Sequence, residues 1–313
     1  MGKITLNNPN FQIFLLKMFG YLDIYCVFCV SLLTNYQAYM QYTINVRGRL
    51  LDLSKPMVMG ILNATPDSFY SGSRKQTEAE IADRANQIVA EGGRIIDVGA
   101  FSTRPGGADE VSLEEETERL KRALEIVRRE QPDAIVSVDT YRPLVARRCV
   151  EEFGADIIND VSEGGITGIV GKEIHEEGDM FETVAQLGVP YILMSVQPTL
   201  AKMMQNFAAE VQRLRDLGAK DIILDPGYGF GKTLEQNYEI MSEAERLLAL
   251  GLPVLVGVSR KSMIYRLVGG DPTTALNGTT VLHTVSLQKG ASILRVHDVK
   301  EAFETIRIVQ QLG

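Results

Sequence analysis

The sequence has no tryptophan and only three cysteines, Cys26, Cys29 and Cys149. Three cysteines cannot build the disulfide framework of a small secreted domain, and one Cys-x-x-Cys without a second pair of ligands is a weak zinc signal. This cysteine usage predicts a reducing compartment, and we expect the cytoplasm. The net charge of −8 argues against a nucleic-acid-binding surface.

Several catalytic signatures are missing as well. The sequence shows no cluster of histidines and cysteines with metal-ligand spacing, and no nucleophile–base pair emerges from it. No Gly-x-Gly-x-x-Gly follows the first strand-like run, which argues against a dinucleotide-binding sheet. Residues 231–233 (Gly-Lys-Thr) look like the end of a P-loop, but Pro226 stands where the first glycine of that motif belongs.

Residues 1–39 form an atypical apolar extension. The run 11–33 is apolar enough to suggest a membrane span, but it contains Lys17 and Asp23, each of which costs roughly 3 kcal/mol at the bilayer centre. Three interpretations stay open: an over-extended translation start, a peripheral or packed helix, and a true anchor. We favour the first, because the sequence from Met40 reads like the start of a soluble enzyme. We expect no membrane contact and a dispensable extension.

From residue 40 the sequence alternates between strand and helix patterns. Residues 42–53 alternate and turn at Arg47-Gly48, which predicts a short hairpin. Eight strand-like runs and eight helical patterns then follow, as in a (β/α)8 TIM barrel. We therefore predict an α/β fold with one barrel domain over residues 40–313. The strand-like runs are 57–63, 94–99, 134–140, 155–160, 190–195, 221–225, 253–259 and 292–297. The helical patterns are 77–91, 112–130, 142–152, 180–187, 201–217, 235–249, 273–289 and 299–312.

Polar residues follow or end nearly every strand-like run. The residues that end the strands of a TIM barrel, and those that begin the loops after them, build its active site. One polar strand end is more often a cap or turn residue, but several at one mouth are hard to explain as structure alone. The candidates in chain order are Asn63, Ser102, Thr103, Arg104, Asp139, Asn159, Ser195, Asp225, Ser259, Arg260, Lys261, Arg295 and His297.

Four of these candidates suit a flat heterocycle. The carboxylates of Asp139 and Asp225 accept hydrogen bonds from ring N–H and amino groups, while Asn159 and Lys261 supply donors to ring nitrogen and oxo acceptors. The glycine-rich loop over residues 225–232 lets backbone approach such a ring closely and offers aromatic faces for stacking.

Other candidates suit a phosphate or diphosphate. Arg295 and His297 lie two apart on one strand and so project to the same side, and Asn63 and Arg104 add polar groups. Asn63 could bind Mg²⁺ that is held mainly by substrate oxygens. An alternative for Arg295 and His297 is a salt bridge to a rim carboxylate such as Asp298. The pattern favours group transfer with a diphosphate leaving group over hydrolysis through a covalent intermediate.

Five separated motifs carry a family resemblance. They are MGILNATPDSF (59–69), STRPG (102–106), IIND (157–160), DPGYGFGK (225–232), and the pair GVSRKS (257–262) with RVHD (295–298). Each motif alone is weak, but all five in this order are specific. On these motifs, residues 40–313 resemble the dihydropteroate synthase family of pterin-binding TIM barrels.

The resemblance implies a complete reaction. A (7,8-dihydropterin-6-yl)methyl diphosphate condenses with 4-aminobenzoate to give 7,8-dihydropteroate and diphosphate in folate biosynthesis. The implied mechanism is dissociative: diphosphate departs, a pterin methylene cation forms, and the neutral arylamine attacks it. The resemblance also implies Mg²⁺, sensitivity of this enzyme class to sulfonamides, and a homodimer formed through late helices.

The resemblance assigns roles to individual positions. It implies that pterin is bound by Asp139, Asn159, Asp225 and Lys261. Diphosphate would be bound by Asn63, Thr103, Arg295 and His297, with Mg²⁺ at Asn63. The aminobenzoate pocket would be lined by Thr65, Pro66, Phe69, Arg104, Phe230 and Ser262. The implied catalytic residues are Asp139, Lys261, Arg295 and His297, with Asp139 stabilising the cation electrostatically.

The chain departs from the family pattern at several positions. Phe101 replaces a common glutamate and Ala64 a usual valine, both in loops that should affect closure more than chemistry. Ser195 stands where histidine is frequent, and the segment 163–179 is longer than expected. These last two changes affect the side of the pterin pocket formed by the fifth barrel strand, so we assign Ser195 no role.

Two other functions stay open. The altered loops and the extension would suit a catalytically silent pterin-binding protein, but the intact Asn63, Arg104, Lys261, Arg295 and His297 argue against it. A pterin-dependent methyltransferase domain would share the Asp and Asn contacts. It would not need residues 257–262 and 295–298, because it handles no diphosphate.

Overall fold

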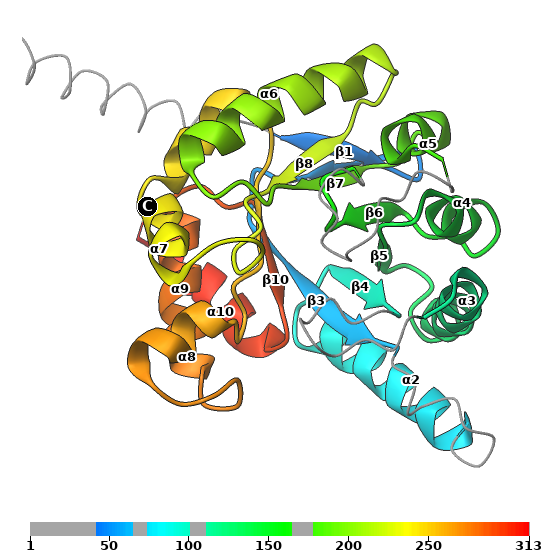
Figure 1. Ribbon diagram of the computed structural model, residues 1–313. Helices are drawn as coiled ribbons and strands as arrows, with labels where there is room; N and C mark the ends of the chain where they lie inside the picture. Colours follow the sequence, from blue (N-terminus) through cyan, green and yellow to red (C-terminus); the bar gives the residue numbers. More distant parts are fainter. Residues whose placement is uncertain (1–41, 65–73, 101–110, 165–177, 313) are drawn as a thin grey trace, which may run out of the picture. The chain divides into compact units, whose positions relative to one another are not determined.

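The computed structural model describes residues 42–64, 74–100, 111–164 and 178–312. The chain divides into two compact units, Met1–Gln41 and Tyr42–Gly313, and the second contains every described element. In that unit helices surround a ring of parallel strands (Figure 1). This confirms the predicted (β/α)8 barrel and the short hairpin before it. The predictions for residues 1–39 concern residues outside the described part.

The barrel contains eight strands in the order β8-β7-β6-β5-β4-β3-β10-β9, and all neighbours pair in parallel. Its two ends meet at a bridge between Leu224 and Val254, where the Leu224 amide donates to Pro253 O at 2.9 Å. The ring is therefore nearly closed. The strands are β3 (Met57–Asn63), β4 (Ile95–Gly99), β5 (Ile135–Asp139), β6 (Ile157–Asp160), β7 (Tyr191–Met194), β8 (Ile222–Asp225), β9 (Leu255–Val256) and β10 (Ile293–Val296).

Helices cover the outside of the ring, and several begin at a side-chain cap. Ser112 accepts from the Glu115 amide, and Thr233 forms a reciprocal capping box with Gln236. No helix among the described residues is long and apolar enough to cross a membrane. The helices are α2 (Arg74–Ala90), α3 (Leu113–Glu130), α4 (Pro143–Glu151), α5 (Met180–Leu187), α6 (Leu200–Asp216), α7 (Leu234–Ser242), the 3₁₀ helix η2 (Ala244–Leu250), α8 (Ser262–Val268), α9 (Leu276–Gln288) and α10 (Val299–Val309).

The late part of the barrel differs from the sequence prediction. The helix predicted over 235–249 is α7 followed by η2, and the helix predicted over 273–289 begins only at Leu276. The short helix α8 was not predicted, because seven residues are too few to show a helical period. The strand predicted over 253–259 forms ladder pairs only at Leu255–Val256.

The floor of the barrel interior is apolar. One cluster of buried side chains joins inward residues of the strands to the hairpin β1 (Thr43–Val46) and β2 (Arg49–Asp52), which contributes Ile44 and Val46. This cluster excludes water from the lower interior and packs the hairpin onto the barrel. The strand members of the cluster are Met57, Met59, Ile95, Ile157, Ile192, Ile223, Leu255 and Ile293.

A layer of polar side chains lies directly above this apolar floor. Successive side chains of a strand point to opposite faces, so the residue two positions beyond an inward isoleucine also faces inward. Five strands obey this rule with a polar residue. The pairs are Ile95 and Asp97 in β4, Ile135 and Ser137 in β5, Ile157 and Asn159 in β6, Ile223 and Asp225 in β8, and Ile293 and Arg295 in β10.

Gly60 lets α2 approach β3 closely. A Cβ atom at Gly60 would lie 2.6 Å from Ile88 Cγ2 and 2.8 Å from Ile88 Cγ1. We expect Gly60→Ala to lower the free energy of unfolding by about 2 kcal/mol, the range typical of overpacking in a core. Urea denaturation of both proteins measures the difference.

Ile88→Ala supplies the control for this expectation, because it removes the atoms that the new Cβ would meet. The double variant Gly60→Ala/Ile88→Ala should lose less stability than the sum of the two single variants. Additive losses would contradict the role given to the Gly60–Ile88 contact.

Candidate active site

A buried arginine lies at the centre of the polar layer. Arg295 Nε donates to Asp97 Oδ2 at 2.6 Å, and Arg295 Nη2 donates to Asp139 Oδ2 at 2.6 Å. Their side chains are 19% (Arg295), 0% (Asp97) and 17% (Asp139) exposed. One cation from β10 thus holds two carboxylates from β4 and β5. The salt bridge considered as an alternative for Arg295 does form, but its partners are Asp97 and Asp139, whereas Asp298 pairs with Arg260, with Arg260 Nη2 at 2.7 Å from Asp298 Oδ1.

Arg295, Asp97 and Asp139 form a triad whose electrostatics depend on the single positive charge of Arg295. The pKa of Asp139 is raised to about 7: burial is the largest cause, the Arg295 charge opposes the rise, and nearby Asp97 adds to it. The neighbouring carboxylates in turn raise the pKa of Arg295 above its ordinary value. Two close carboxylates in a water-poor interior cannot both ionise without a cation. The Arg295 charge therefore favours the ionised form of Asp139, whose pKa would otherwise be raised further by burial.

Two acceptor atoms beside the triad have no partner. Asn159 Nδ2 donates to Asp97 Oδ2 at 3.1 Å, but Asn159 Oδ1 and Asp97 Oδ1 are buried and accept no hydrogen bond from any residue that the structure describes. Ser137 Oγ, on the strand between them, is also buried without a partner. Buried polar atoms are almost always paired, so unpaired acceptors that face the same interior indicate a ligand that donates hydrogen bonds there.

A second carboxylate–cation pair lies across the layer. Asp225 ends β8 and is 6% exposed, and burial raises its pKa while the Lys261 charge opposes that shift. Burial lowers the pKa of Lys261 to about 8. The Lys261 ammonium donates to the Tyr228 carbonyl and lies 4.5 Å from the centroid of the Phe230 ring. Lys261 and Phe230 therefore meet at one wall of the site, as expected for residues that bind a flat ring.

One ammonium group holds the loop after β8 in shape. Lys232 Nζ donates to three carbonyl oxygens, at 2.8 Å (Ser195), 3.0 Å (Gly227) and 3.1 Å (Phe230). Gly227 has φ +64°, and a Cβ atom there would collide with the Ser195 carbonyl. The loop thus lies against the end of β7, and Phe230 is held by backbone contacts. Sequence reasoning gave Lys232 no role, because it considered this residue only as part of a P-loop.

The two departures in β7 and in the loop after β6 are in contact. Ser195 Oγ donates to Glu163 Oε1 at 3.1 Å, and Gln197 Nε2 lies 3.3 Å from Glu163 Oε2. Glu163 is 1% exposed, and burial raises its pKa. The serine at the end of β7 therefore has a partner that the longer segment supplies. The described structure gives Ser195 a contact behind the site and supports no catalytic role for it.

The rim of the site carries the remaining candidates. His297 follows β10, and both its amide and its Nδ1 lie 3.1 Å from Ser259 Oγ. Burial and the Arg295 charge lower the pKa of His297 to about 4, so the ring is neutral at neutral pH. Asn63 ends β3 and is exposed, and it pairs in register with Gly99, where a Cβ atom would lie 3.9 Å from Asn63 Oδ1. The missing side chain leaves space beside the Asn63 amide.

The structure brings many of the predicted residues to one end of the barrel. Strand ends or the loops directly after them carry Asn63, Asp139, Asn159, Asp225, Phe230, Lys261, Ser262, Arg295 and His297. Others lie outside the described residues, namely Thr65, Pro66, Phe69, Thr103 and Arg104. Asp97 was missed because it lies inside β4, two residues before the strand ends. The alternation from Ile95 would have identified it.

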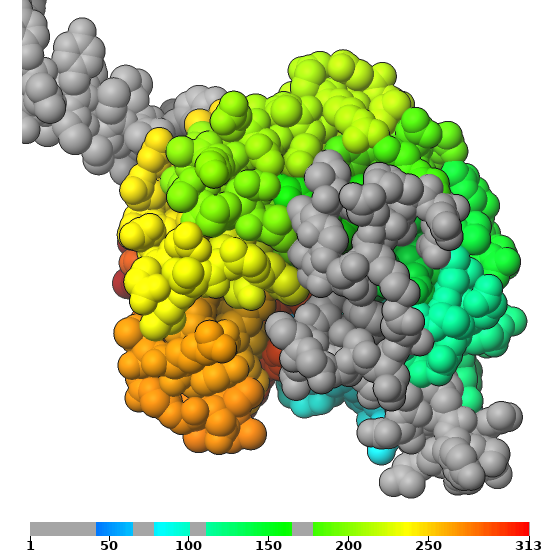
Figure 2. All heavy atoms as spheres, in the orientation of Figure 1, coloured from blue at the N-terminus to red at the C-terminus, as the bar shows by residue number. Residues whose placement is uncertain are grey.

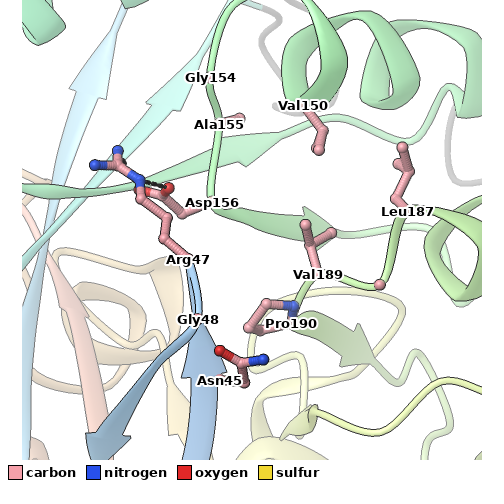
Figure 3. Close-up of a pocket in the computed structure, with 11 residues that line it drawn as sticks. Asn45, Arg47, Gly48, Val150, Gly154, Ala155, Asp156, Leu187, Val189 and Pro190 are labelled. Atoms are coloured by element: carbon pink, nitrogen blue, oxygen red, sulfur yellow. Dashed lines mark hydrogen bonds and ion pairs between the residues drawn. The ribbon is translucent and has the colours of Figure 1, made fainter.

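A cavity of about 440 Å³ lies at the other end of the strands (Figure 3). It is lined by hairpin residues such as Asn45 and by Val189 and Pro190 before β7. Its one carboxylate, Asp156, is occupied by the guanidinium groups of Arg47 and Arg128 and by the Val136 amide. This cavity therefore lacks the unpaired acceptors that mark the polar layer.

The sequence of the barrel is similar to that of known proteins over most of its length. Residues 59–297 match the family of pterin binding enzymes. The dihydropteroate synthase of Escherichia coli (strain K12) is 38% identical over 279 residues, which cover 84% of this chain and 94% of that protein.

Solved structures agree with this match. Dihydropteroate synthase of Xanthomonas albilineans with 4-aminobenzoic acid superposes with a TM-score of 0.76 at 32% identity, covering 87% of this chain and 98% of that one. The Yersinia pestis dihydropteroate synthase, in complex with a sulfonamide drug, superposes with a TM-score of 0.75 at 35% identity, covering 87% and 99%.

We expect Asp97→Asn to destabilise the protein by about 3 kcal/mol, because breaking a buried ion pair leaves the remaining charge poorly compensated. Chemical denaturation measures this loss. The matched control is Asp83→Asn on the exposed face of α2, which should change stability by less than about 0.5 kcal/mol. Equal small effects of both substitutions would contradict the role of Asp97 as a partner of Arg295.

Proposed function

The chain belongs to the dihydropteroate synthase family of pterin-binding enzymes, and we propose that it condenses (7,8-dihydropterin-6-yl)methyl diphosphate with 4-aminobenzoate to give 7,8-dihydropteroate and diphosphate in folate biosynthesis. One observation on the chain itself carries this function: the unpaired acceptors Asp97 Oδ1 and Asn159 Oδ1 lie beside Asp139 in the barrel interior. A pterin edge offers adjacent N–H and amino donors, which such acceptors require.

The proposed binding mode follows the layers of the barrel. The pterin ring occupies the polar layer, with Asp139, Asn159, Asp225 and Lys261 along its edge. The diphosphate lies nearer the rim, between Asn63 and the pair Arg295 and His297. Support comes from the chemistry of each group, because Arg295 carries a fixed positive charge and the rim residues end strands that surround the same opening. Phe230 supplies a stacking face.

Mg²⁺ suits the rim of this site. Among the described residues, no group of three or more His, Cys, Asp or Glu side chains could hold a metal ion. Asn63 offers one exposed amide oxygen with open space beside it at Gly99. Mg²⁺ commonly keeps several waters and binds through substrate phosphates, so one protein oxygen is a sufficient anchor. When bound, Mg²⁺ would neutralise charge on the leaving diphosphate.

The proposed mechanism is dissociative and uses electrostatics in place of a nucleophile. As the C–O bond to diphosphate breaks, positive charge develops on the pterin methylene and ring. The ionised Asp139 carboxylate stabilises this charge in a site of low dielectric. Arg295 and the neutral, N–H-bearing His297 donate to the diphosphate oxygens. The aromatic amine then attacks the methylene carbon and releases a proton, which balances the reaction.

The alternatives are less well supported. A methyltransferase domain handles no diphosphate and would have no use for His297 at the rim. A silent pterin-binding protein would need Arg295 as the partner of Asp97 and Asp139, but it would have no use for a diphosphate site at Asn63 and His297. Inhibition by sulfonamides is part of the proposal, because these drugs resemble the arylamine substrate.

We further propose a cytoplasmic homodimer formed through the late helices. Leu267, Val268 and Val281 of α8 and α9 are 57%, 72% and 55% exposed, which is unusual for three apolar residues on neighbouring elements. Figure 2 shows the α8 region, in orange, standing out at one side of the barrel. A second copy of the chain would cover such a surface. The scarcity of cysteine supports a reducing compartment.

The direct test is diphosphate release by the full chain with the pterin diphosphate and Mg²⁺, with and without 4-aminobenzoate. We expect sustained release only when the arylamine is present, with formation of dihydropteroate. Arg295→Ala should lower kcat/KM by about a hundredfold or more, since it removes charge-assisted contacts to the leaving group. The exposed Arg246, changed to alanine, is the control and should leave the rate unchanged.

Two outcomes would contradict the proposed function. Diphosphate release at the same rate without 4-aminobenzoate would indicate a hydrolase. Tight binding of the pterin without turnover would identify a silent pterin-binding protein.

Removal of the Asn63 amide tests the metal site. We expect Asn63→Ala to raise the Mg²⁺ concentration that gives half-maximal rate by about tenfold. Loss of one residue that binds or orients a metal typically weakens metal affinity by this factor or more. A Mg²⁺ titration of initial rates measures it. An unchanged Mg²⁺ dependence would contradict the assignment of Asn63.

A further inference from the structure

The ladder between β3 and β10 ends below the rim. The last pair in register is Gly60 with Val296. Beyond it, Ile61 to Asn63 pair with β4 only, and His297 lies past the end of β10. The two strands therefore separate at the level where Asn63 stands on one side and His297 on the other. The spacing across this seam is not fixed by the strand ladder.

Arg84 of α2 bridges the seam. Arg84 Nε donates to Ile61 O at 3.2 Å, and Arg84 Nη2 donates to His297 O at 2.6 Å. One guanidinium thus bonds a carbonyl of each strand just beyond their last pair. A planar guanidinium with several fixed donors holds two acceptors at a defined separation, which a flexible ammonium does not do.

The position of Arg84 is itself fixed by packing. Ile88, four residues on along the same face of α2, meets β3 at Gly60, where a Cβ atom would lie within 2.6 Å of it. This close approach places the preceding helical turn, with Arg84, over the seam. Arg84 Nη1 also donates to Gln87 Oε1 at 3.0 Å, and Gln87 Nε2 donates to Glu91 Oε1 at 2.8 Å.

Arg84 also contributes to the charge at the rim. Its own pKa is lowered by burial, and its charge is one of several that depress the pKa of His297. The other cations that act on His297 are Arg295 and Arg260, and Asp298 opposes them. Arg84 is therefore close enough to the rim for its charge to act there while its donors remain bonded to backbone.

We propose that Arg84 is a positioning residue for the diphosphate: by fixing the β3–β10 seam, it sets the spacing between Asn63 and His297. This inference rests on the proposed function, because it names the part of the substrate that the seam serves. It predicts different effects on the binding of the diphosphate and on the binding of the pterin ring. Loss of Arg84 should weaken the hold on the diphosphate and leave the pterin layer intact, since Arg295 and its partner Asp97 lie at the level of the ladder pair between Arg295 and Met59, below the seam.

Arg128 provides a matched control for a merely structural arginine. Arg128 Nη1 donates to Ala134 O at 2.7 Å, its Nε donates to Gly154 O at 3.2 Å, and Arg128 also pairs with Asp156. It therefore bonds backbone carbonyls of two segments, as Arg84 does, but at the opposite end of the strands. Arg128→Gln should lower stability without a change in substrate binding.

The experiment compares wild type, Arg84→Gln, Arg84→Lys and Arg128→Gln in the full chain. Steady-state kinetics give kcat and KM for the pterin diphosphate, and calorimetry gives Kd for the same pterin with a free hydroxymethyl group. For Arg84→Gln we expect a KM for the diphosphate substrate about tenfold higher, as one lost charge-assisted contact allows. The Kd of the diphosphate-free pterin should stay within about twofold of wild type. Arg84→Lys, which keeps one charged donor, should recover part of the KM.

Each outcome decides the inference. A similar rise in KM for Arg84→Gln and Arg128→Gln, or an equal weakening of both pterins, would show that Arg84 acts only on overall stability. An unchanged KM in a folded Arg84→Gln would also overturn the inference. If Arg84→Gln does not fold, Arg84→Lys carries the same comparison. Turnover by wild type tests the proposed function separately, so failure of the Arg84 variants to respond would leave that function standing.

Discussion

The site depends on one buried cation between two buried carboxylates. Arg295 reaches Asp97 and Asp139 at 2.6 Å each, inside a barrel whose lower interior is wholly apolar. Burial and the nearby Asp97 carboxylate raise the pKa of Asp139, and the Arg295 charge opposes that rise. The cation therefore favours the ionised form of Asp139 before any substrate arrives. Preorganised charge of this kind is the main source of catalysis in sites that lack a nucleophile.

The barrel supplies this arrangement by a simple repetition. Inward isoleucines form much of the floor, and two residues further along five strands a polar side chain faces the same interior. Burying so many polar groups is unfavourable unless each finds a partner. Most polar groups of this layer do, through Arg295, Lys261 and backbone amides. Among the described side chains that line the polar layer, the exceptions on Asp97, Ser137 and Asn159 lie together on neighbouring strands. Unpaired acceptors concentrated at one place indicate where binding energy is available to a ligand.

The fold was predictable because its signal is periodic, and the site only in part. Eight alternating units gave the barrel, and polar strand ends gave Asp139, Asn159, Asp225, Lys261 and Arg295. Asp97 was missed because an aspartate within the run IIDVG looks like an interruption of a buried strand, although alternation places it on the same face as Ile95. Contacts between side chains that are far apart in the sequence could not be predicted either. Nothing local in the sequence links Ser195 to Glu163, or Arg84 to the carbonyl of His297. Thr65, Pro66, Phe69, Thr103 and Arg104 stay predictions.

The most direct measurement is a crystal structure of the chain with Mg²⁺ and an unreactive analogue of the pterin diphosphate. Our account expects the pterin N–H groups on Asp97, Asn159 and Asp225, and the diphosphate between Asn63 and the Arg295–His297 pair. It would be contradicted by a ring bound away from the polar layer, for example in the cavity beside Asn45 and Pro190. A diphosphate that makes no contact with Arg295 or His297 would contradict it as well.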